Sequence, residues 1–531
     1  FAEFHGLSNE RAETLSKLTF LRESKPFPRN AVQHSITPMN ITQIYRPSLA
    51  LLTDLYQLTM AYGYWKAGLA DKEAVFHLYF RKHPFGSGFT LACGLEQALD
   101  YLENLRFEED DLTYLASLTG SDGEALFERG FLDYLGNLQF TCEVDAVPEG
   151  TPVFPYEPLV RVQGPILQAQ IVETLLLTII NFQTLIATKA ARVCLAARGE
   201  AVLEFGARRA QGIDGALTAS RAAYIGGCAA TSNVLAGKVW DIPVRGTHAH
   251  SWVMLFDDEL EAFQTYAEAM PNNCVFLVDT YDTLDGVRHA IEVGKGLRKK
   301  GHKLVGVRLD SGDLATLSIG ARRLLDEAGF NDAAIVASND LDEYLIRSLK
   351  EQGAKITVWG VGTRLATAYD QPALGGVYKL SAVRENGDWQ PRLKLSEQTI
   401  KISNPGLLQV RRFFRSSDDK TARGQLFADA IYDALQPPAK DWVIVDPTDS
   451  LLRWKVAPEM ESVDLLVPVM RNGKRIYQAP SIHETREQAR RNLETLADGL
   501  KRFENPHRYQ SGLEEGLHMR KEKMIVAARN A

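Results

Sequence analysis

The sequence predicts an α/β protein built on a parallel sheet, and three observations lead to this fold class. Between about residues 200 and 383, short β-branched or apolar runs alternate with windows of helical periodicity, which is the order of βαβ units. These runs are apolar at consecutive positions, as strands buried on both faces are. Nearly every run ends in charged, glycine or hydroxyl residues. The candidate strands are 201–205, 242–246, 274–279, 304–310, 333–338, 356–360 and 376–383.

The polar residues at the strand ends favour a barrel over an open, doubly wound sheet. They form the clusters EFGARR, RGTHAHS, DTYD, RLDSGD, SNDLD and GVGT, each at the carboxyl end of a candidate strand. A barrel collects the carboxyl ends of its strands around one mouth, where its active site lies. We therefore expect an α/β barrel whose site is lined by these clusters.

The segments on either side of the predicted barrel have a different sequence pattern. Residues 141–165 alternate β-formers with Pro and Gly turn signals, which predicts antiparallel strands, and residues 484–503 read as a charged surface helix. We expect four segments. Residues 1–44 form a disordered N-terminal extension, 45–195 an α+β domain, 196–385 the catalytic barrel, and 386–531 a segment that returns to the N-terminal domain and ends in a helical tail.

Composition narrows the classes of partner. The net charge of −7 gives no general attraction to polyanions, so nucleic acid is not an expected partner. The five cysteines include no CxxC pair, which favours reduced thiols in the cytoplasm. The most apolar window, 171–190, is interrupted by Glu173, Asn181 and Gln183. We expect it to be a buried helix and expect no membrane partner.

Arg308 and Asp310 lie two residues apart on a candidate strand, so their side chains share one face. Such a pair can be an internal ion pair followed by a helix cap at Ser311–Asp313. It can also be a binding site, because a planar guanidinium suits a carboxylate and an aspartate suits ribose hydroxyls. The surrounding polar rim favours the binding site.

Two further patterns fit a phosphate and an aromatic ring. Gly360, Gly362 and Thr363 follow a strand and precede a helix, where backbone N–H groups and a hydroxyl can hold a phosphate; a plain tight turn is the alternative. Tyr56 and Phe205 can be ordinary core aromatics or can stack on a ring. Arg208, directly after Phe205 and Gly206, can be a surface residue or a phosphate ligand.

The segment His248-Ala249-His250 admits two chemical interpretations. His-x-His at a barrel strand end opens the sites of metal-dependent hydrolases, but that class needs further histidine ligands, which the later strand ends lack. A single nucleophilic or acid-base histidine needs only a carboxylate to orient its ring. The next strand supplies Asp279 and Asp282.

The ordered motifs together resemble the nicotinate phosphoribosyltransferase family over roughly residues 45–520. They are LLTDLYQLTMAYGYW, EFGARRAQG, SNVLAG, GTHAHS, VDTYD, GVRLDSGDL, GVGT, GGVYKL and NPHRYQSGLEE. The resemblance implies an incomplete α/β barrel of about seven strands, with a β-rich N-terminal domain completed by the C-terminal segment. It also implies a homodimer whose active sites form between subunits, and a cytoplasmic enzyme of NAD biosynthesis. Its substrates would be nicotinate, phosphoribosyl pyrophosphate and ATP, with Mg²⁺ bridging the pyrophosphate.

The resemblance also assigns roles to single residues. His250 would be the histidine that ATP phosphorylates, Asp279 would orient it, and Asp310 would hold the ribose hydroxyls, whereas His248 would be incidental. The nicotinate ring would lie between Phe205 and Tyr56 of the partner subunit, with Arg308 facing its carboxylate and Thr247 close by. The phosphate groups would bind Arg208, Gly360, Gly362 and Thr363. The residues that hold Mg²⁺ are not identified by it.

Two other activities stay open from the sequence. Nicotinamide-using relatives read the amide with an acid in a segment that corresponds to 226–237, where this chain has Ser232 and no acid. This difference favours nicotinate over nicotinamide, because an acid there would repel a carboxylate. A barrel metal-dependent hydrolase is the alternative from a different class, and it predicts bound zinc and activity without ATP.

Overall fold

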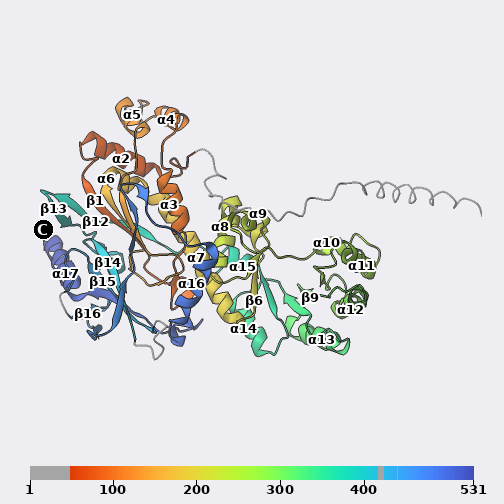
Figure 1. The fold of residues 1–531 in the computed structure, drawn as a ribbon. Coiled ribbons are helices and arrows are strands. Elements are labelled where there is room, and N and C mark those ends of the chain that lie inside the picture. Colours follow the sequence, from red (N-terminus) through yellow and green to blue (C-terminus); the bar gives the residue numbers. More distant parts are fainter. Residues whose placement is uncertain (1–47, 416–423, 439–440, 531) are drawn as a thin grey trace, which may run out of the picture. The chain divides into compact units, whose positions relative to one another are not determined.

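The computed structural model describes residues 48–415, 424–438 and 441–530. The predicted disordered extension, residues 1–44, lies outside the described residues. The described chain has a mixed α/β fold with one parallel sheet, two larger sheets that are wholly or mainly antiparallel, and one short strand pair. Figure 1 labels the main elements along the chain.

The parallel sheet contains six strands in the order β7-β6-β11-β10-β9-β8. They are β7 (Ala230–Thr231), β6 (Ala201–Glu204), β11 (Val358–Val361), β10 (Ala334–Ala337), β9 (Gly306–Leu309) and β8 (Val275–Leu277). The helices of this region are α8 (Gly212–Ile225), α9 (Val234–Trp240), α10 (His250–Val253), α11 (Glu259–Ala269), α12 (Thr283–Lys299), α13 (Leu314–Glu327), α14 (Glu343–Glu351) and α15 (Thr363–Ala366). Five of the candidate strands therefore lie in this sheet, as predicted.

The candidate strand 376–383 was assigned to the wrong sheet. It forms β12 (Val377–Glu385), which pairs antiparallel with β1 (Glu73–Tyr79) and β13 (Asp388–Pro391). Tyr378 stacks on Phe76 at 5.0 Å, and its hydroxyl donates to Ala169 O, so this strand is anchored among N-terminal residues. A short apolar run predicts a strand, but it does not say which strand will be its neighbour.

The candidate strand 242–246 is also different from the prediction. Among the described residues, its only ladder contact is a single parallel bridge between Val244 and Thr231 of β7, which Pro243 limits because proline has no N–H to donate. The segment then continues to His248, whose Nε2 accepts a hydrogen bond from Leu277 N of β8 at 3.2 Å. Residues 243–248 thus connect the two edge strands of the parallel sheet.

The antiparallel sheets combine segments from both ends of the chain. The seven-stranded sheet has the order β13-β12-β1-β5-β3-β19-β20, and a six-stranded sheet has the order β17-β16-β21-β15-β14-β18. Their other strands are β5 (Val160–Pro165), β3 (Glu143–Ala146), β19 (Val467–Arg471), β20 (Lys474–Arg475), β17 (Arg453–Val456), β16 (Trp442–Val445), β21 (Gln510–Glu514), β15 (Leu426–Asp433), β14 (Leu408–Phe414) and β18 (Glu461–Asp464). β2 (Thr90–Leu91) pairs with β4 (Pro152–Val153).

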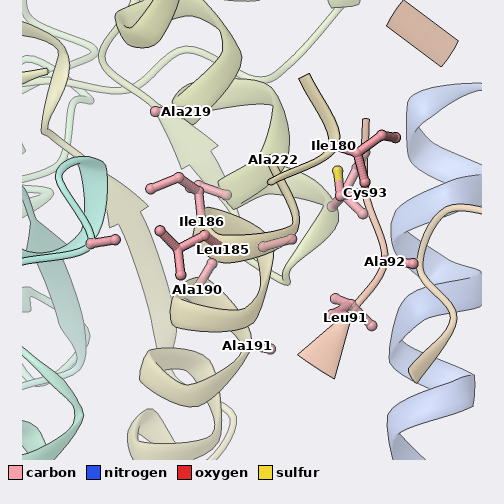
Figure 2. Close-up of a cluster of buried hydrophobic side chains, with 14 of the residues drawn as sticks. Leu91, Ala92, Cys93, Ile180, Leu185, Ile186, Ala190, Ala191, Ala219 and Ala222 are labelled. Atoms are coloured by element: carbon pink, nitrogen blue, oxygen red, sulfur yellow. The ribbon is translucent and has the colours of Figure 1, made fainter. Parts of the chain in front are cut away.

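The long helix α7 (Glu173–Ala197) covers most of the apolar window of the sequence. By length and composition it could cross a membrane, but 67% of its most apolar stretch is buried within the protein. Leu185, Ile186 and Ala190 lie in one hydrophobic cluster with Ala219 and Ala222 of α8 (Figure 2). The prediction of a buried helix is therefore confirmed.

The remaining helices belong to the N-terminal and C-terminal segments of the chain. They are α2 (Leu55–Lys66), α3 (Leu95–Glu103), α4 (Glu109–Ala116), α5 (Arg129–Gly136), α6 (Ile166–Ile171), α16 (Ile482–Glu494) and α17 (Glu515–Asn530). α16 begins with a capping box in which Ser481 and Glu484 satisfy each other's backbone N–H groups. The predicted surface helix over 484–503 is confirmed only for its first part, since α16 ends at Glu494 and its Arg486 donates to the carbonyl oxygens of Cys228 and Gly227.

Candidate active site

The polar clusters after β8, β9 and β10 divide their residues between two tasks. The last acid of each cluster caps the following helix: Asp282 caps α12, Asp313 caps α13 and Asp342 caps α14. Each accepts backbone N–H groups of the first helical turn, as N-caps do. The first polar residues, Asp279, Asp310 and Ser338, are then free to meet one another at the end of the sheet.

Arg308 joins several of these residues through hydrogen bonds. Its Nε donates to Ser338 Oγ at 2.9 Å, its Nη1 to Thr247 Oγ1 at 2.9 Å, and its Nη2 to Asp310 Oδ1 at 2.8 Å. The guanidinium also lies 5.6 Å from the centroid of the Phe205 ring. A guanidinium has five N–H donors, so these three bonds leave one N–H on each terminal nitrogen for a ligand.

Asp310 is held as a carboxylate. Burial raises its pKa, but the hydrogen bond from Ser338 and the charge of Arg308 outweigh burial, so the pKa lies below its ordinary value. Ser338 Oγ donates to the same oxygen, Oδ1, that accepts from Arg308. The second oxygen, Oδ2, lies 3.8 Å from His250 Nε2. Asp310 thus keeps one oxygen for the protein and presents the other to the histidine and the open side of the site.

His250 begins the short helix α10 and is 39% exposed. Its Nδ1 lies 3.2 Å from Thr280 Oγ1, which makes Thr280 the hydroxyl partner of the ring. Asp279 has other contacts: its Oδ2 accepts from Asp310 N at 2.9 Å and from Ser311 Oγ at 2.6 Å. Asp279 therefore fixes the loop that carries Asp310, while its neighbour Thr280 contacts the histidine.

His248 has a different environment from His250. It is 8% exposed, its ring contacts Phe263, Tyr266 and Phe276, and burial lowers its pKa to about 4. A neutral ring with an unprotonated Nε2 agrees with the hydrogen bond that this nitrogen accepts from Leu277 N. His248 therefore fastens the segment that carries Thr247 and His250 to strand β8.

Phe205 and the glycine loop lie against each other. A Cβ atom added to Gly360 would come within 2.8 Å of two Phe205 ring atoms, and one added to Gly362 would come within 3.2 Å of Phe205 O. Glycine is therefore needed at Gly360 for the aromatic ring to lie against β11. Gly362 precedes the one-turn helix α15, which starts at Thr363. The predicted phosphate loop thus adjoins the predicted ring-binding aromatic.

Two predicted site residues lie apart from the contacts that join the others. Tyr56, on α2, is 47% exposed, and burial and the charges of Glu173 and Asp54 raise its pKa. Arg208 lies in the single turn Ala207–Arg209 after Phe205 and is exposed. Among the described residues, the ring that lies against the Arg308 guanidinium is that of Phe205.

The acids of the site do not form a closed metal cage. Within residues 48–415, 424–438 and 441–530, no group of three or more His, Cys, Asp or Glu side chains is arranged to hold a metal. Asp279 Oδ1, however, is buried and has no hydrogen-bond partner in the described part of the chain. Mg²⁺ is commonly held by one or two carboxylates together with substrate phosphates, so Asp279 and Asp310 fit a substrate-bound Mg²⁺ better than a zinc site.

Comparisons with known proteins point to one family. Sequence models of the nicotinate phosphoribosyltransferase N-terminal domain, family and C-terminal domain match residues 51–181, 201–403 and 410–521. The nicotinate phosphoribosyltransferase of Bacillus subtilis (strain 168) is 45% identical over 479 residues, covering 90% of this chain and 95% of the relative. The chain belongs to the nicotinate phosphoribosyltransferase family. The nicotinate phosphoribosyltransferase of Bos taurus is 36% identical over 525 residues, covering 88% and 95%.

Solved structures give the same family. The crystal structure of human nicotinic acid phosphoribosyltransferase has a TM-score of 0.77 and 34% identity, and the match covers 89% of this chain and 99% of the human chain. The nicotinate-nucleotide pyrophosphorylase of Pyrococcus furiosus has a TM-score of 0.63 at 22% identity, which shows a shared fold. The chain is an enzyme of the nicotinate phosphoribosyltransferase family with a mixed α/β fold.

Sequence reasoning missed several residues that build the site of this nicotinate phosphoribosyltransferase family member. Ser338 joins Arg308 to Asp310, Thr280 contacts His250, and Ser311 anchors Asp279. Each is a small hydroxyl residue in a cluster already noted as polar. The register of β9 with β10 pairs Val336 with Arg308 and Ala337 with Leu309, so Ser338 falls level with Asp310. Knowledge of this register, which the sequence does not supply, would have identified Ser338.

Proposed function

We propose that the chain transfers the phosphoribosyl group of phosphoribosyl pyrophosphate to nicotinate in the pathway of NAD biosynthesis. The bond between ribose C1 and the pyrophosphate oxygen breaks, and a bond between C1 and the pyridine nitrogen forms, giving nicotinate mononucleotide and pyrophosphate. The observation that carries this proposal is the contact network of Arg308, Asp310, Thr247 and His250 at the end of one parallel sheet, in a chain of this family.

Arg308 is the proposed receptor of the nicotinate carboxylate. It has one free N–H on each terminal nitrogen, and the Thr247 hydroxyl is within hydrogen-bonding distance of it. A carboxylate that accepts two parallel N–H groups is bound more strongly and in a more defined orientation than a neutral amide. The absence of an acid in 226–237 supports the same preference, so nicotinamide is the weaker substrate of the two.

The pyridine ring is proposed to lie on Phe205 and to be covered by Tyr56 of a second subunit. Phe205 contacts the Arg308 guanidinium on one side and the Gly360 backbone on another. The exposure of Tyr56 and its separate surroundings support a role toward another copy of the chain. We propose a homodimer whose two active sites are shared between subunits.

Asp310 is proposed to hold the ribose hydroxyls, because its lowered pKa keeps it an acceptor at neutral pH. The phosphate groups would bind Arg208, which follows β6, and Gly360, Gly362 and Thr363, which lie at the end of β11 and the start of α15. Asp279 and Asp310 would hold Mg²⁺, which neutralises charge on the pyrophosphate when bound. These groups hold the ring and C1 in line while positive charge develops on the ribose, and such positioning lowers the barrier.

His250 is proposed to accept a phosphoryl group from ATP, which couples ATP hydrolysis to the transfer. Its ring is partly exposed, Thr280 fixes Nδ1, and Asp310 lies beside Nε2. A phosphorylated ring would place additional negative charge beside the ribose-binding acid, and its hydrolysis would favour product formation. We also propose that the parallel sheet is an incomplete barrel and that residues 243–248 span the gap between its edge strands β7 and β8. We propose that the enzyme acts in the cytoplasm.

The test is an assay of the purified protein with nicotinate or nicotinamide, each with phosphoribosyl pyrophosphate and Mg²⁺, with and without ATP. We expect mononucleotide from nicotinate, faster with ATP, and little from nicotinamide. Absence of mononucleotide, or a preference for nicotinamide, contradicts the proposal. Zinc that copurifies with the protein and supports hydrolysis without ATP would favour the metal-dependent hydrolase instead.

A further inference from the structure

Glu204, the last residue of β6, is an acid to which the proposed reaction gives no role. Its side chain is 1% exposed, and it lies directly before Phe205 and level with Thr231 of β7 and Val361 of β11. Burial of a carboxylate is unfavourable unless hydrogen bonds replace the water that it loses. Glu204 therefore needs several donors from the surrounding protein.

Three donors surround the carboxylate of Glu204. Its Oε1 accepts from Gly206 N, and its Oε2 accepts from Ser220 Oγ at 2.8 Å and from Thr231 Oγ1 at 2.6 Å. All three of these donors are uncharged. They come from the turn after β6, from α8 and from β7, so the acid joins three segments of the chain.

The bond to Oε1 fixes the backbone around Phe205. Phe205 N donates to Val361 O at 2.8 Å, and the next N–H, that of Gly206, donates to Glu204. A Cβ atom on Gly206 would overlap Ala366 Cβ, so this turn also lies directly against α15. The backbone on both sides of Phe205 is consequently held, and with it the ring that is proposed to bind the pyridine.

The bonds to Oε2 fix the segment that follows β7. Thr231 Oγ1 also accepts from Asn233 N at 3.0 Å, and Asn233 Nδ2 donates to Ser220 Oγ at 3.3 Å. Between these two residues lies Ser232, whose N donates to Glu204 O at 2.9 Å. Ser232 belongs to the segment in which the sequence favours nicotinate over nicotinamide. Glu204 therefore holds this segment through its backbone as well as its side chain.

Thr231 extends the same support to the segment that carries Thr247. Thr231 N donates to Pro243 O at 3.0 Å, and Thr231 O accepts from Arg245 N at 3.0 Å. Two residues further along the chain, Thr247 Oγ1 accepts from the Arg308 guanidinium. The segment that supports the proposed nicotinate receptor is thus joined to the buried acid of β6.

We propose that Glu204 is a positioning residue of the transfer reaction, which holds Phe205 and the segment of Ser232 at a fixed spacing around nicotinate. This inference rests on the proposed function. The carboxylate acts through the two segments that it joins rather than on the substrate. Such support matters because a displacement of about 1 Å in a binding pocket can lower the rate about a hundredfold.

The main test removes the bond between Glu204 and β7. Thr231→Val keeps the shape of the side chain and leaves the bond from Gly206 N in place. The KM for nicotinate should rise about tenfold, because a hydrogen bond to a charged group is lost, while kcat and the KM for phosphoribosyl pyrophosphate stay near their natural values. The matched control is Thr188→Val on α7, a fully buried threonine that also accepts a backbone N–H, from Leu91 at 2.9 Å. It should leave both KM values unchanged.

Two substitutions of the acid itself give a second measurement. Glu204→Ala removes every acceptor and should raise the KM for nicotinate at least as much as Thr231→Val does. Glu204→Gln keeps one acceptor for Gly206 N, and its amide can donate to the hydroxyls of Ser220 and Thr231. The KM for nicotinate in Glu204→Gln should therefore stay near its natural value. Urea denaturation shows which variants fold, and Thr231→Val decides the question if Glu204→Ala does not.

The outcomes separate this inference from the proposed function. A KM for nicotinate that rises in Thr231→Val but not in Thr188→Val supports the positioning role. Mononucleotide formation with an unchanged KM in Thr231→Val overturns it, and so does a fall in kcat alone, which a purely structural role would give. Absence of mononucleotide from the natural chain overturns the proposed function and this inference with it.

Discussion

Two Arg–Asp pairs in this molecule have the same chemistry and different surroundings. In the parallel sheet, Arg308 and Asp310 are 17% and 30% exposed, and each keeps hydrogen-bonding capacity that the protein does not use. In the antiparallel sheet, Arg412 and Asp429 are 4% and 0% exposed, and Tyr509 donates to the same carboxylate. The comparison shows that the charges of a binding site are held in place but keep hydrogen-bonding groups free for a ligand. In a structural pair, the protein itself surrounds and bonds both charges.

The largest expected effect is on catalysis, from Arg308→Leu. Loss of two charge-assisted bonds to nicotinate should lower kcat/KM about a thousandfold, since each such bond contributes about 1.5–3 kcal/mol. The matched control is Arg322→Leu, because Arg322 is 16% exposed but bonds only to α13 and its exit loop. Steady-state kinetics should show near-normal turnover for the folded control. Equal losses in both variants would mean that Arg308 acts through stability alone.

Arg412→Leu should show the opposite result, with a loss of stability and little loss of catalysis. It leaves the fully buried Asp429 without its cation, and breaking such a pair costs about 3–5 kcal/mol of the free energy of unfolding. Urea denaturation measures this loss, while the kcat of the folded fraction should stay near that of the natural chain. A normal unfolding midpoint with reduced kcat would reverse the contrast between the two pairs.

His250→Ala tests the part of the site that opens toward ATP. The variant should keep slow phosphoribosyl transfer but lose ATP hydrolysis coupled to it, because the proposed phosphoryl acceptor is gone. His289→Ala is the control: this ring is 35% exposed, similar to His250, but bonds to Glu259 outside the site. Measured ATP stimulation that survives in His250→Ala would remove this histidine from the proposed coupling.

Much of the parallel sheet was predictable from the sequence, because buried strands leave continuous apolar runs and their polar ends are local in sequence. Arg308 and Asp310 were identified in this way, Thr247 was named only through the family resemblance, and the structure joins the three. The partners of those residues were not predictable. Ser338 meets Asp310 only through the register of two strands, and strand 377–385 joined another sheet because distant aromatic contacts anchor it.

Ser338→Ala has the smallest expected effect, because it changes a single hydrogen bond of the Arg308–Asp310 pair. Removal of its hydroxyl takes away a hydrogen bond that lowers the pKa of Asp310, so this pKa should rise. Because the carboxylate is the active form, the acid limb of the kcat/KM profile should move to higher pH, with activity lost on that limb and little change at neutral pH, where the carboxyl stays ionised. Ser381→Ala, a buried hydroxyl bonded to Val75 O in the antiparallel sheet, should leave the pH profile unchanged.

The most direct test of the central claim is a crystal structure of the protein with bound nicotinate mononucleotide. We expect the pyridine carboxylate on Arg308, the ring against Phe205 and the ribose hydroxyls on Asp310, with His250 beside the ribose. A mononucleotide bound elsewhere, with the Arg308 guanidinium contacting only Ser338, Thr247 and Asp310, would contradict it.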